Sequence, residues 1–145
     1  MEQLKQAKTF LVEKGITNAT TGIVLGTGLH KVLDHVKVLQ TIPYNEIPNF
    51  AVSTVEFHKG NLVYGKLGDK NVLIMQGRFH QYEGYTMGQI VFPVRVMKLL
   101  GVKALFLSNA AGGINLNYKK GDLVLLDDHI NLQSRNPLTG NDSRN

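Results

Sequence analysis

The chain contains the apolar run Val72-Leu73-Ile74-Met75, followed at once by Gln76-Gly77-Arg78-Phe79-His80-Gln81-Tyr82-Glu83-Gly84-Tyr85, a charged loop bounded by glycines. A buried strand that ends in such a loop and leads into a helix is the usual way in which α/β proteins present anion-binding groups. Two further glycine loops follow apolar runs: Gly26-Thr27-Gly28 and Asn109-Ala110-Ala111-Gly112-Gly113. The sequence therefore predicts an α/β fold, a mixed β-sheet flanked by helices, with polar loops at the strand ends.

Outward from this stretch, hydrophobic periodicity predicts the other elements. We expect helices over residues 2–14 and 87–100, a helix opening over 29–36, and strands over 22–26, 36–42, 61–67, 71–75, 103–108 and 122–126. The strands 61–67 and 71–75 form a hairpin across Gly68-Asp69-Lys70, and 22–26 and 103–108 are buried. Pro93 either kinks the helix over 87–100 or lies early in its ordered part.

Composition narrows the class of protein. A chain of 145 residues with 43% hydrophobic residues is one globular domain or part of one, and no run approaches the roughly 20 apolar residues of a membrane span. The N-terminus lacks a basic leader followed by an apolar segment, so we expect a cytoplasmic protein. Without cysteine, a disulfide, a thiolate metal site and a cysteine nucleophile are excluded.

The net charge of +5 points to small anions. The 16 basic residues are scattered and their longest run is Lys119-Lys120, so the concentrated basic stripe of a nucleic-acid groove is missing. His129 follows Asp128, but no other histidine or carboxylate stands at helical ligand spacing from it, so we expect no metal. Affinity for a small anion fits this charge pattern better.

The loop Gly26-Thr27-Gly28 places a hydroxyl between two residues that permit close backbone approach, which suits a phosphate. A dinucleotide fingerprint would need a glycine where Lys31 stands, and the chain has no Walker-type glycine-lysine-serine sequence. A plain turn remains the alternative for this loop. The small residues of Asn109–Gly113 likewise allow either an approach of amides to a ligand or a tight turn.

Arg78 offers a planar, permanently charged fork for two phosphate oxygens, and His80 can add a donor to the same anion. Glu83 is expected to orient Arg78 or a ribose hydroxyl, because a carboxylate beside a guanidinium is a poor base. Tyr82 suits a sugar face, with a half-buried structural tyrosine as the alternative. His58 precedes the hairpin and could reach the anion.

Six blocks together resemble the trimeric purine nucleoside phosphorylases: residues 22–29, 53–58, 77–85, 92–96, 109–113 and 128–131. They occur in the family's order and spacing along nearly the whole chain. The arginine block reads Arg-Phe-His-x-Tyr-Glu-Gly-Tyr and lacks the Arg-Gln-His form of the related methylthioadenosine phosphorylases.

The resemblance implies the nucleoside phosphorylase fold and reversible phosphorolysis of purine nucleosides to free base and ribose 1-phosphate, with orthophosphate as co-substrate and no cofactor. It implies catalytic roles for Arg78, His80 and Glu83. The phosphate-binding positions are Thr27, His58, Arg78, Phe79, His80 and Ala110, and Tyr82 matches a ribose contact. Thr27 stands where the family usually has serine, which keeps the hydroxyl and adds a methyl group.

Family members are roughly twice as long, so residues 1–145 resemble the N-terminal, phosphate-binding portion of a single nucleoside phosphorylase domain. We expect the full-length protein to be a homotrimer and the 145-residue chain alone to be inactive or nearly so. Two alternatives remain open: a non-catalytic phosphate- or nucleoside-binding module, and a sister phosphorylase of different base specificity, such as the methylthioadenosine type.

Overall fold

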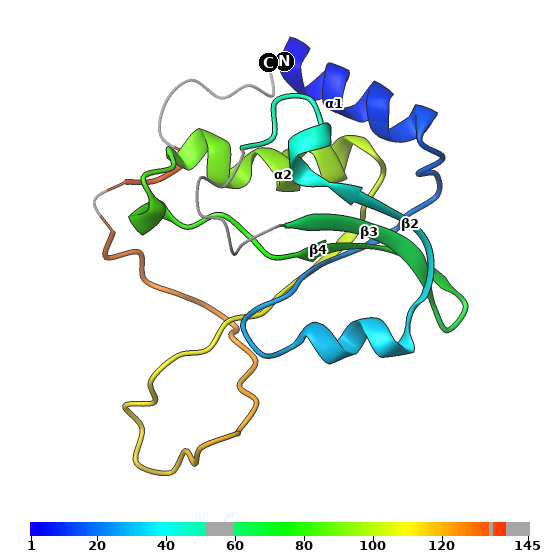
Figure 1. Ribbon diagram of the computed structural model, residues 1–145. Helices are drawn as coiled ribbons and strands as arrows, with labels where there is room; N and C mark the ends of the chain where they lie inside the picture. The colour runs from blue at the N-terminus through cyan, green and yellow to red at the C-terminus, as the bar shows by residue number, and fades with distance from the viewer. Residues whose placement is uncertain (52–59, 134, 139–145) are drawn as a thin grey trace.

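A computed structural model describes residues 1–51, 60–133 and 135–138. Within these residues, β1 (Thr21–Val24), β2 (Lys37–Pro43), β3 (Asn61–Leu67), β4 (Lys70–Gln76) and β5 (Ala104–Leu107) form one sheet in the order β2-β3-β4-β1-β5. β1 lies between β4 and β5 and runs parallel to both, whereas β2, β3 and β4 are antiparallel neighbours. The predicted mixed sheet flanked by helices is confirmed (Figure 1).

Two α-helices, α1 (Glu2–Glu13) and α2 (Met87–Leu99), pack against each other on one face of the sheet (Figure 1). α2 begins with a capping box, in which the Thr86 hydroxyl accepts from the Gln89 amide while the Gln89 side chain accepts from the Thr86 amide. Pro93 lies buried inside α2. In the part of the chain that the structure describes, neither helix has the length and apolar character needed to cross a bilayer.

The segment 29–36 differs from the predicted helix opening. It forms the short 3₁₀ helix η1 (His30–His35), and Val36 already has extended backbone angles, because β2 starts directly afterwards. η1 covers the sheet face opposite α1 and α2 (Figure 1). Two shorter 3₁₀ turns follow, η2 (Tyr44–Glu46) and η3 (Gln81–Glu83).

The alternation of side chains along β4 divides the core into two layers. Leu73 and Met75 belong to the cluster that α1 and α2 cover, whereas Val72 and Ile74 belong to the cluster on the η1 side. This is the period of two expected for a strand buried on both faces. β4 is therefore a central strand buried on both faces, and the charged loop leaves directly from it.

The hairpin turn is one residue shorter than predicted. Leu67 pairs with Lys70, so the turn is Gly68-Asp69, and Gly68 has φ +60°, a left-handed angle that favours glycine. The difference arises because the backbone of Lys70 continues the ladder although its side chain is exposed.

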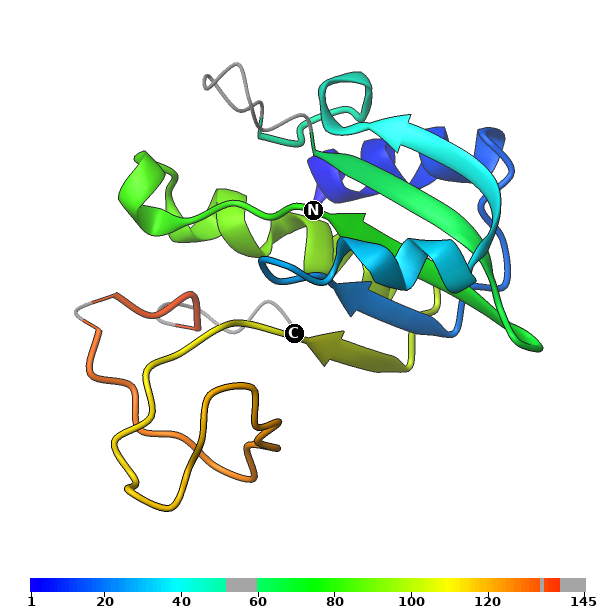
Figure 2. The ribbon, with the colours of Figure 1, turned by 60° about the horizontal axis from the view of Figure 1, so that its bottom comes forward.

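Residues 103–108 form the predicted strand, but the prediction that this strand is buried is wrong. β5 forms, but among the described strands it pairs only with β1, and Phe106 and Leu107 are 63% and 69% exposed. The strand predicted over 122–126 is absent from the described residues, where that segment is exposed irregular backbone. An apolar run needs a neighbouring strand to complete its hydrogen bonds, and this segment leads away from the sheet (Figure 2).

Candidate functional site

The parallel arrangement of β4, β1 and β5 brings three glycine loops to the same end of the sheet. The carboxyl ends of adjacent parallel strands lie side by side, and α/β proteins bind ligands at this end of the sheet. Gly26–Gly28 follows β1, Gly77–Tyr85 follows β4 and Asn109–Gly113 follows β5. Stretches that are separated along the chain are thus neighbours in the fold.

Ser108, directly after β5, joins these loops through four hydrogen bonds. Its Oγ accepts from the Gly26 amide at 2.8 Å and donates to the Val24 carbonyl at 3.0 Å. Its own amide also donates to the Val24 carbonyl at 3.2 Å, and its carbonyl accepts from Nη1 of Arg78. Sequence reasoning placed Ser108 at the end of a strand and gave it no role, although a hydroxyl between an apolar run and a glycine loop was a usable signal.

Arg78 is half-buried and is held from two sides. Its Nη1 donates to the Ser108 carbonyl, and its Nε donates to Nε2 of His80 over 3.1 Å. A guanidinium has five N–H donors in a fixed fork, so these two bonds set its plane and leave further donors for an anion. An anion would bind to these remaining donors, and the phosphate-binding role of Arg78 stays a prediction.

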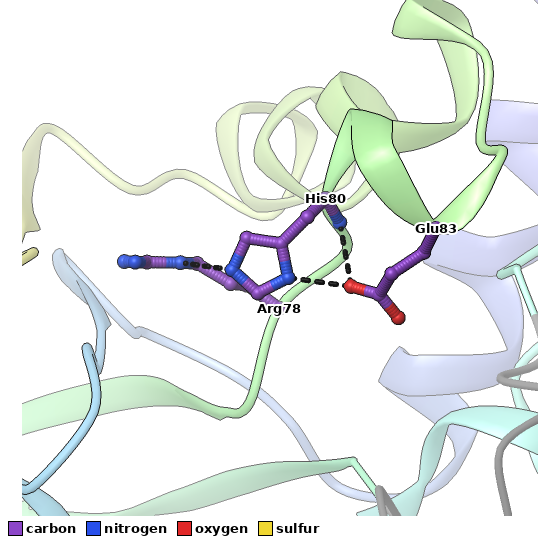
Figure 3. Close-up of polar contacts among 3 residues, drawn as sticks. All are labelled: Arg78, His80 and Glu83. Atoms are coloured by element: carbon purple, nitrogen blue, oxygen red, sulfur yellow. Dashed lines mark hydrogen bonds and ion pairs between the residues drawn. The ribbon is translucent and has the colours of Figure 1, made fainter.

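Glu83 contacts His80 twice (Figure 3). Its Oε1 accepts from the His80 backbone amide at 3.1 Å and lies 2.5 Å from Nδ1 of the His80 ring. Since Nε2 accepts from Arg78, the hydrogen-bond pattern assigns the proton to Nδ1. The predicted contact of Glu83 with Arg78 is thus indirect, because the short turn η3 places the carboxylate beside the residue that precedes it, His80.

Phe79 points away from Arg78 and His80 into the core. Its side chain is only 6% exposed and its ring lies 5.4 Å from the ring of Tyr44 and 5.2 Å from that of Tyr85. Successive side chains of an extended segment point to opposite sides, so the burial of Phe79 turns its two neighbours outward. Of the predicted phosphate contacts, Phe79 therefore has only its backbone to offer.

Tyr44, which sequence reasoning missed, anchors the start of the same loop. Its hydroxyl donates to the Gly77 carbonyl at 2.7 Å, and burial raises the pKa of this phenol well above its usual range. Its ring also leaves no room at Gly60, where an added Cβ would come within 2.3 Å of the ring carbons. Tyr44 therefore fastens the start of the arginine loop to the core.

Tyr82 lies at the surface, 85% exposed, and its ring stacks on His80 with centroids 4.8 Å apart and planes 17° from parallel. Thr27 and Ala110 are exposed in the loops that Gly26 and Ser108 anchor. In the described part of the chain, no residue accepts a hydrogen bond from the amide or hydroxyl of Thr27. His58 lies outside the described residues.

The structure thus links Arg78 to Glu83 through hydrogen bonds that both make with His80, and it holds Thr27 and Ala110 in adjoining loops. Within residues 1–51, 60–133 and 135–138, no three histidine, aspartate or glutamate side chains gather in a group that could hold a metal ion. The chemistry that the described groups offer is the binding of an anion by a guanidinium, backbone amides and a hydroxyl.

Comparison with known proteins identifies the family. The profile of the Phosphorylase superfamily matches residues 20–144. Purine nucleoside phosphorylase 1 of Geobacillus stearothermophilus is 52% identical over 141 residues, which are 97% of this chain and 52% of the relative. Purine nucleoside phosphorylase of Mus musculus is 51% identical over 126 residues, which are 84% of this chain and 44% of the relative.

A solved structure of purine nucleoside phosphorylase in complex with ribose-1-phosphate superimposes with a TM-score of 0.78 at 49% identity, covering 83% of this chain and 44% of that one. The chain spans about half the length of the curated relatives that it matches. The family resemblance read from the sequence blocks and the nucleoside phosphorylase fold are confirmed. With its strands in this order and its profile matched over most of its length, the chain belongs to the phosphorylase superfamily.

Proposed function

We propose that residues 1–145 are the N-terminal portion of a single purine nucleoside phosphorylase domain and supply its orthophosphate site and part of its ribose site. The reaction is the reversible phosphorolysis of purine ribonucleosides and 2′-deoxyribonucleosides to free base and (2-deoxy)ribose 1-phosphate. One observation supports this most directly: Arg78, oriented by His80 and by the Ser108 carbonyl, stands where three parallel strands end.

The geometry suits the chemistry. In phosphorolysis the bond from C1′ to the purine nitrogen breaks, the base leaves with the electron pair, and a phosphate oxygen forms the new bond to C1′. The sugar passes through an oxocarbenium-like state, which an adjacent phosphate dianion stabilises before it attacks. Arg78 and the Thr27 loop would hold the dianion in place, so that the encounter becomes nearly unimolecular.

The contacts of Glu83 and His80 fit a positioning role in this scheme. The carboxylate fixes the imidazole with its proton on Nδ1, and the lone pair on Nε2 then accepts a hydrogen bond from Nε of Arg78. The unused guanidinium donors are thereby aimed before phosphate arrives, which lowers the ordering cost of binding. Tyr82, stacked on His80 and exposed, offers an aromatic face to the ribose.

Several expectations from the sequence belong to the same proposal and rest on the similarity to purine nucleoside phosphorylases. They are a homotrimeric assembly, a cytoplasmic location, the use of orthophosphate as co-substrate without a cofactor, and the phosphate contacts of His58 and Ala110. A further expectation is that the groups that hold the purine base lie in the part of the relatives' length that this chain does not span.

Orthophosphate titration by calorimetry tests the proposal on the chain as it stands. Each hydrogen bond to a charged group contributes about 1.5–3 kcal/mol, so Arg78→Ala is expected to weaken phosphate binding by roughly 10- to 100-fold. Arg95→Ala removes an exposed arginine from α2 and serves as the matched control, with unchanged affinity expected. No binding to the unchanged chain, or equal loss in both variants, would contradict the proposal.

An inosine phosphorolysis assay in the same buffer separates the enzyme from the binding module. We expect little or no turnover by the 145-residue chain, because we expect the groups that stabilise the departing base to lie in the half of the relatives' length that this chain does not span. Turnover that Arg78→Ala abolishes would show that residues 1–145 suffice for catalysis. The chain alone is expected to bind phosphate without turnover. If turnover then appears when the remaining half of a relative is added as a separate polypeptide, the result would support the enzyme over the binding module.

A further inference from the structure

We propose that Ser108 is a positioning residue of the orthophosphate site, which holds the Thr27 loop and Arg78 in a fixed relation to each other. The inference rests on the proposed function, because it concerns how that anion site is assembled. Ser108 lies 82 residues after Gly26 and 30 residues after Arg78, yet it hydrogen-bonds to both. It is the point where the loops that follow β1, β4 and β5 meet.

The first part of the argument is the Ser108 hydroxyl. Oγ accepts from the Gly26 amide and donates to the Val24 carbonyl, so both polar functions of the hydroxyl are used at 2.8 Å and 3.0 Å. The Gly26 amide therefore points toward β5 and is removed from the set of donors that an anion could use. With Gly26 fastened, the next residue, Thr27, is left exposed with its amide and hydroxyl unbound in the described part of the chain.

The second part is an independent observation on Gly26. A Cβ atom added at Gly26 would stand 2.7 Å from the Ser108 carbonyl oxygen and 3.2 Å from Cα of Asn109. Real Cβ atoms do not approach backbone so closely, so the two strand-end backbones touch and only glycine fits. The contact of the Ser108 hydroxyl with the Gly26 amide thus follows from the close packing of the two backbones and does not depend on the rotamer of Ser108 alone.

The third part is the Ser108 carbonyl, which accepts from Nη1 of Arg78. The same residue therefore orders the Thr27 loop through its side chain and orients the guanidinium through its backbone. A phosphate that bridges Thr27 and Arg78 needs both at a set separation, and a shift at either side weakens the bidentate arrangement. Removing the hydroxyl should release the Thr27 loop while leaving the carbonyl contact in place.

The experiment compares Ser108→Ala, Ser108→Thr and Ser108→Cys with the unchanged chain, and uses Thr41→Ala as control. Thr41 is exposed on β2, at the opposite edge of the sheet, so its loss removes a hydroxyl without touching the loops. Two quantities are measured: the dissociation constant for inorganic phosphate by calorimetry, and amide hydrogen exchange at Gly26 by NMR. Amides of Leu73 and Ile74 report on the core.

We expect Ser108→Ala to weaken phosphate binding by about 3- to 10-fold and to speed Gly26 exchange by about 10-fold, as for the loss of roughly one hydrogen bond. Exchange at Leu73 and Ile74 should not change, which separates positioning from general destabilisation. Ser108→Thr keeps the hydroxyl, so its phosphate affinity and Gly26 exchange rate should equal those of the unchanged chain. Ser108→Cys should give values between those of Ser108→Ala and the unchanged chain. If Ser108→Ala does not fold, the phosphate affinity and the Gly26 exchange of Ser108→Thr and Ser108→Cys test the role of the hydroxyl.

The outcomes separate the two proposals. If the unchanged chain does not bind phosphate, the proposed function fails, and Gly26 exchange alone then decides whether Ser108 holds the loop. If the unchanged chain binds phosphate but Ser108→Ala binds equally well, or if Gly26 exchange is the same in both, the role of Ser108 is overturned. Failure of Ser108→Thr to restore binding would also overturn it.

Discussion

Nδ1 of His80 lies 2.5 Å from Oε1 of Glu83, while the opposite ring nitrogen accepts a hydrogen bond from Arg78 at 3.1 Å (Figure 3). The three side chains form one line from carboxylate through imidazole to guanidinium. Each member restricts the next, so the direction of the Arg78 fork depends on a carboxylate that it does not touch. This relationship yields the first prediction.

Replacing Glu83 by alanine should release His80 and, through it, Arg78. We expect Glu83→Ala to weaken phosphate binding by about 3- to 10-fold, the effect of losing roughly one hydrogen bond in the line. Glu83→Gln keeps an oxygen that can accept from Nδ1 and should lose less. Calorimetry measures the affinity, and the ¹⁵N shifts of the His80 ring report the tautomer. An unchanged tautomer in Glu83→Ala would contradict this role.

Tyr44 provides a prediction on pH. Burial raises the pKa of its phenol in the folded chain above the value of about 10 that it has when unfolded. The stability that the neutral phenol contributes is therefore fully present below about pH 10 and is lost as the pH rises beyond it. The free energy of unfolding, measured by denaturant titration from pH 8 to 11, should fall at the alkaline end.

Tyr44→Phe removes both the titration and the hydrogen bond to the Gly77 carbonyl. At neutral pH this variant should be less stable by about 1 kcal/mol. Its alkaline decline should be shallower than that of the unchanged chain, because the variant lacks the buried phenol whose pKa is raised on folding. Parallel stability curves across this pH range would show that Tyr44 is not the group responsible.

Gly26→Ala tests the close contact between strand ends. The new Cβ would meet the Ser108 carbonyl at 2.7 Å, so the backbone after β5 must move, at an expected cost of about 1–3 kcal/mol in unfolding free energy. Gly88→Ala is the matched control, because its Cβ would meet only Thr86 Oγ1 at 3.9 Å near the start of α2. The control should be neutral or slightly stabilising. Equal unfolding midpoints for both variants would rule out the tight contact.

The exposed edge of β5 predicts self-association of the 145-residue chain. Phe106 and Leu107 are exposed on a strand whose only partner among the described strands is β1, a known hazard for pairing between molecules. Phe106→Thr should reduce self-association in sedimentation experiments and change stability by less than about 0.5 kcal/mol.

Leu105→Thr gives the contrast on the same strand. Leu105 packs against the core under α2, so this variant should lose about 1–3 kcal/mol of stability without a comparable gain in solubility. If Phe106→Thr sediments as the unchanged chain does, the exposed edge is not the cause of association.

Much of the local structure could be predicted because it depends on neighbours in sequence. The apolar run before Arg78 became β4, and the spacing of α1 and α2 followed the helical period. Even the contact between His80 and Glu83 has a local origin, since residues three apart meet across a short helical turn. The local prediction that was wrong is the helix opening over residues 29–36, where β2 begins before an α-helix can form.

Burial could not be predicted in the same way. Phe79 and Phe106 both follow or lie within apolar stretches, yet Phe79 is 6% exposed and Phe106 is 63% exposed. The difference arises because Phe79 meets Tyr44 and Tyr85, whereas β5 is an edge strand. The segment 122–126 shows the same limit, because strand propensity does not supply a partner strand.

By itself, the sequence determined most of the elements, the three glycine loops and the residue types that can bind an anion, since these depend on periodicity and on side-chain chemistry. Only the tertiary structure decided that Gly26, Arg78 and Ser108 meet, because contacts over 82 and 30 residues depend on the order of strands in the sheet. The parallel neighbours β4, β1 and β5 place their carboxyl ends together, and that arrangement turns separate loops into one candidate site.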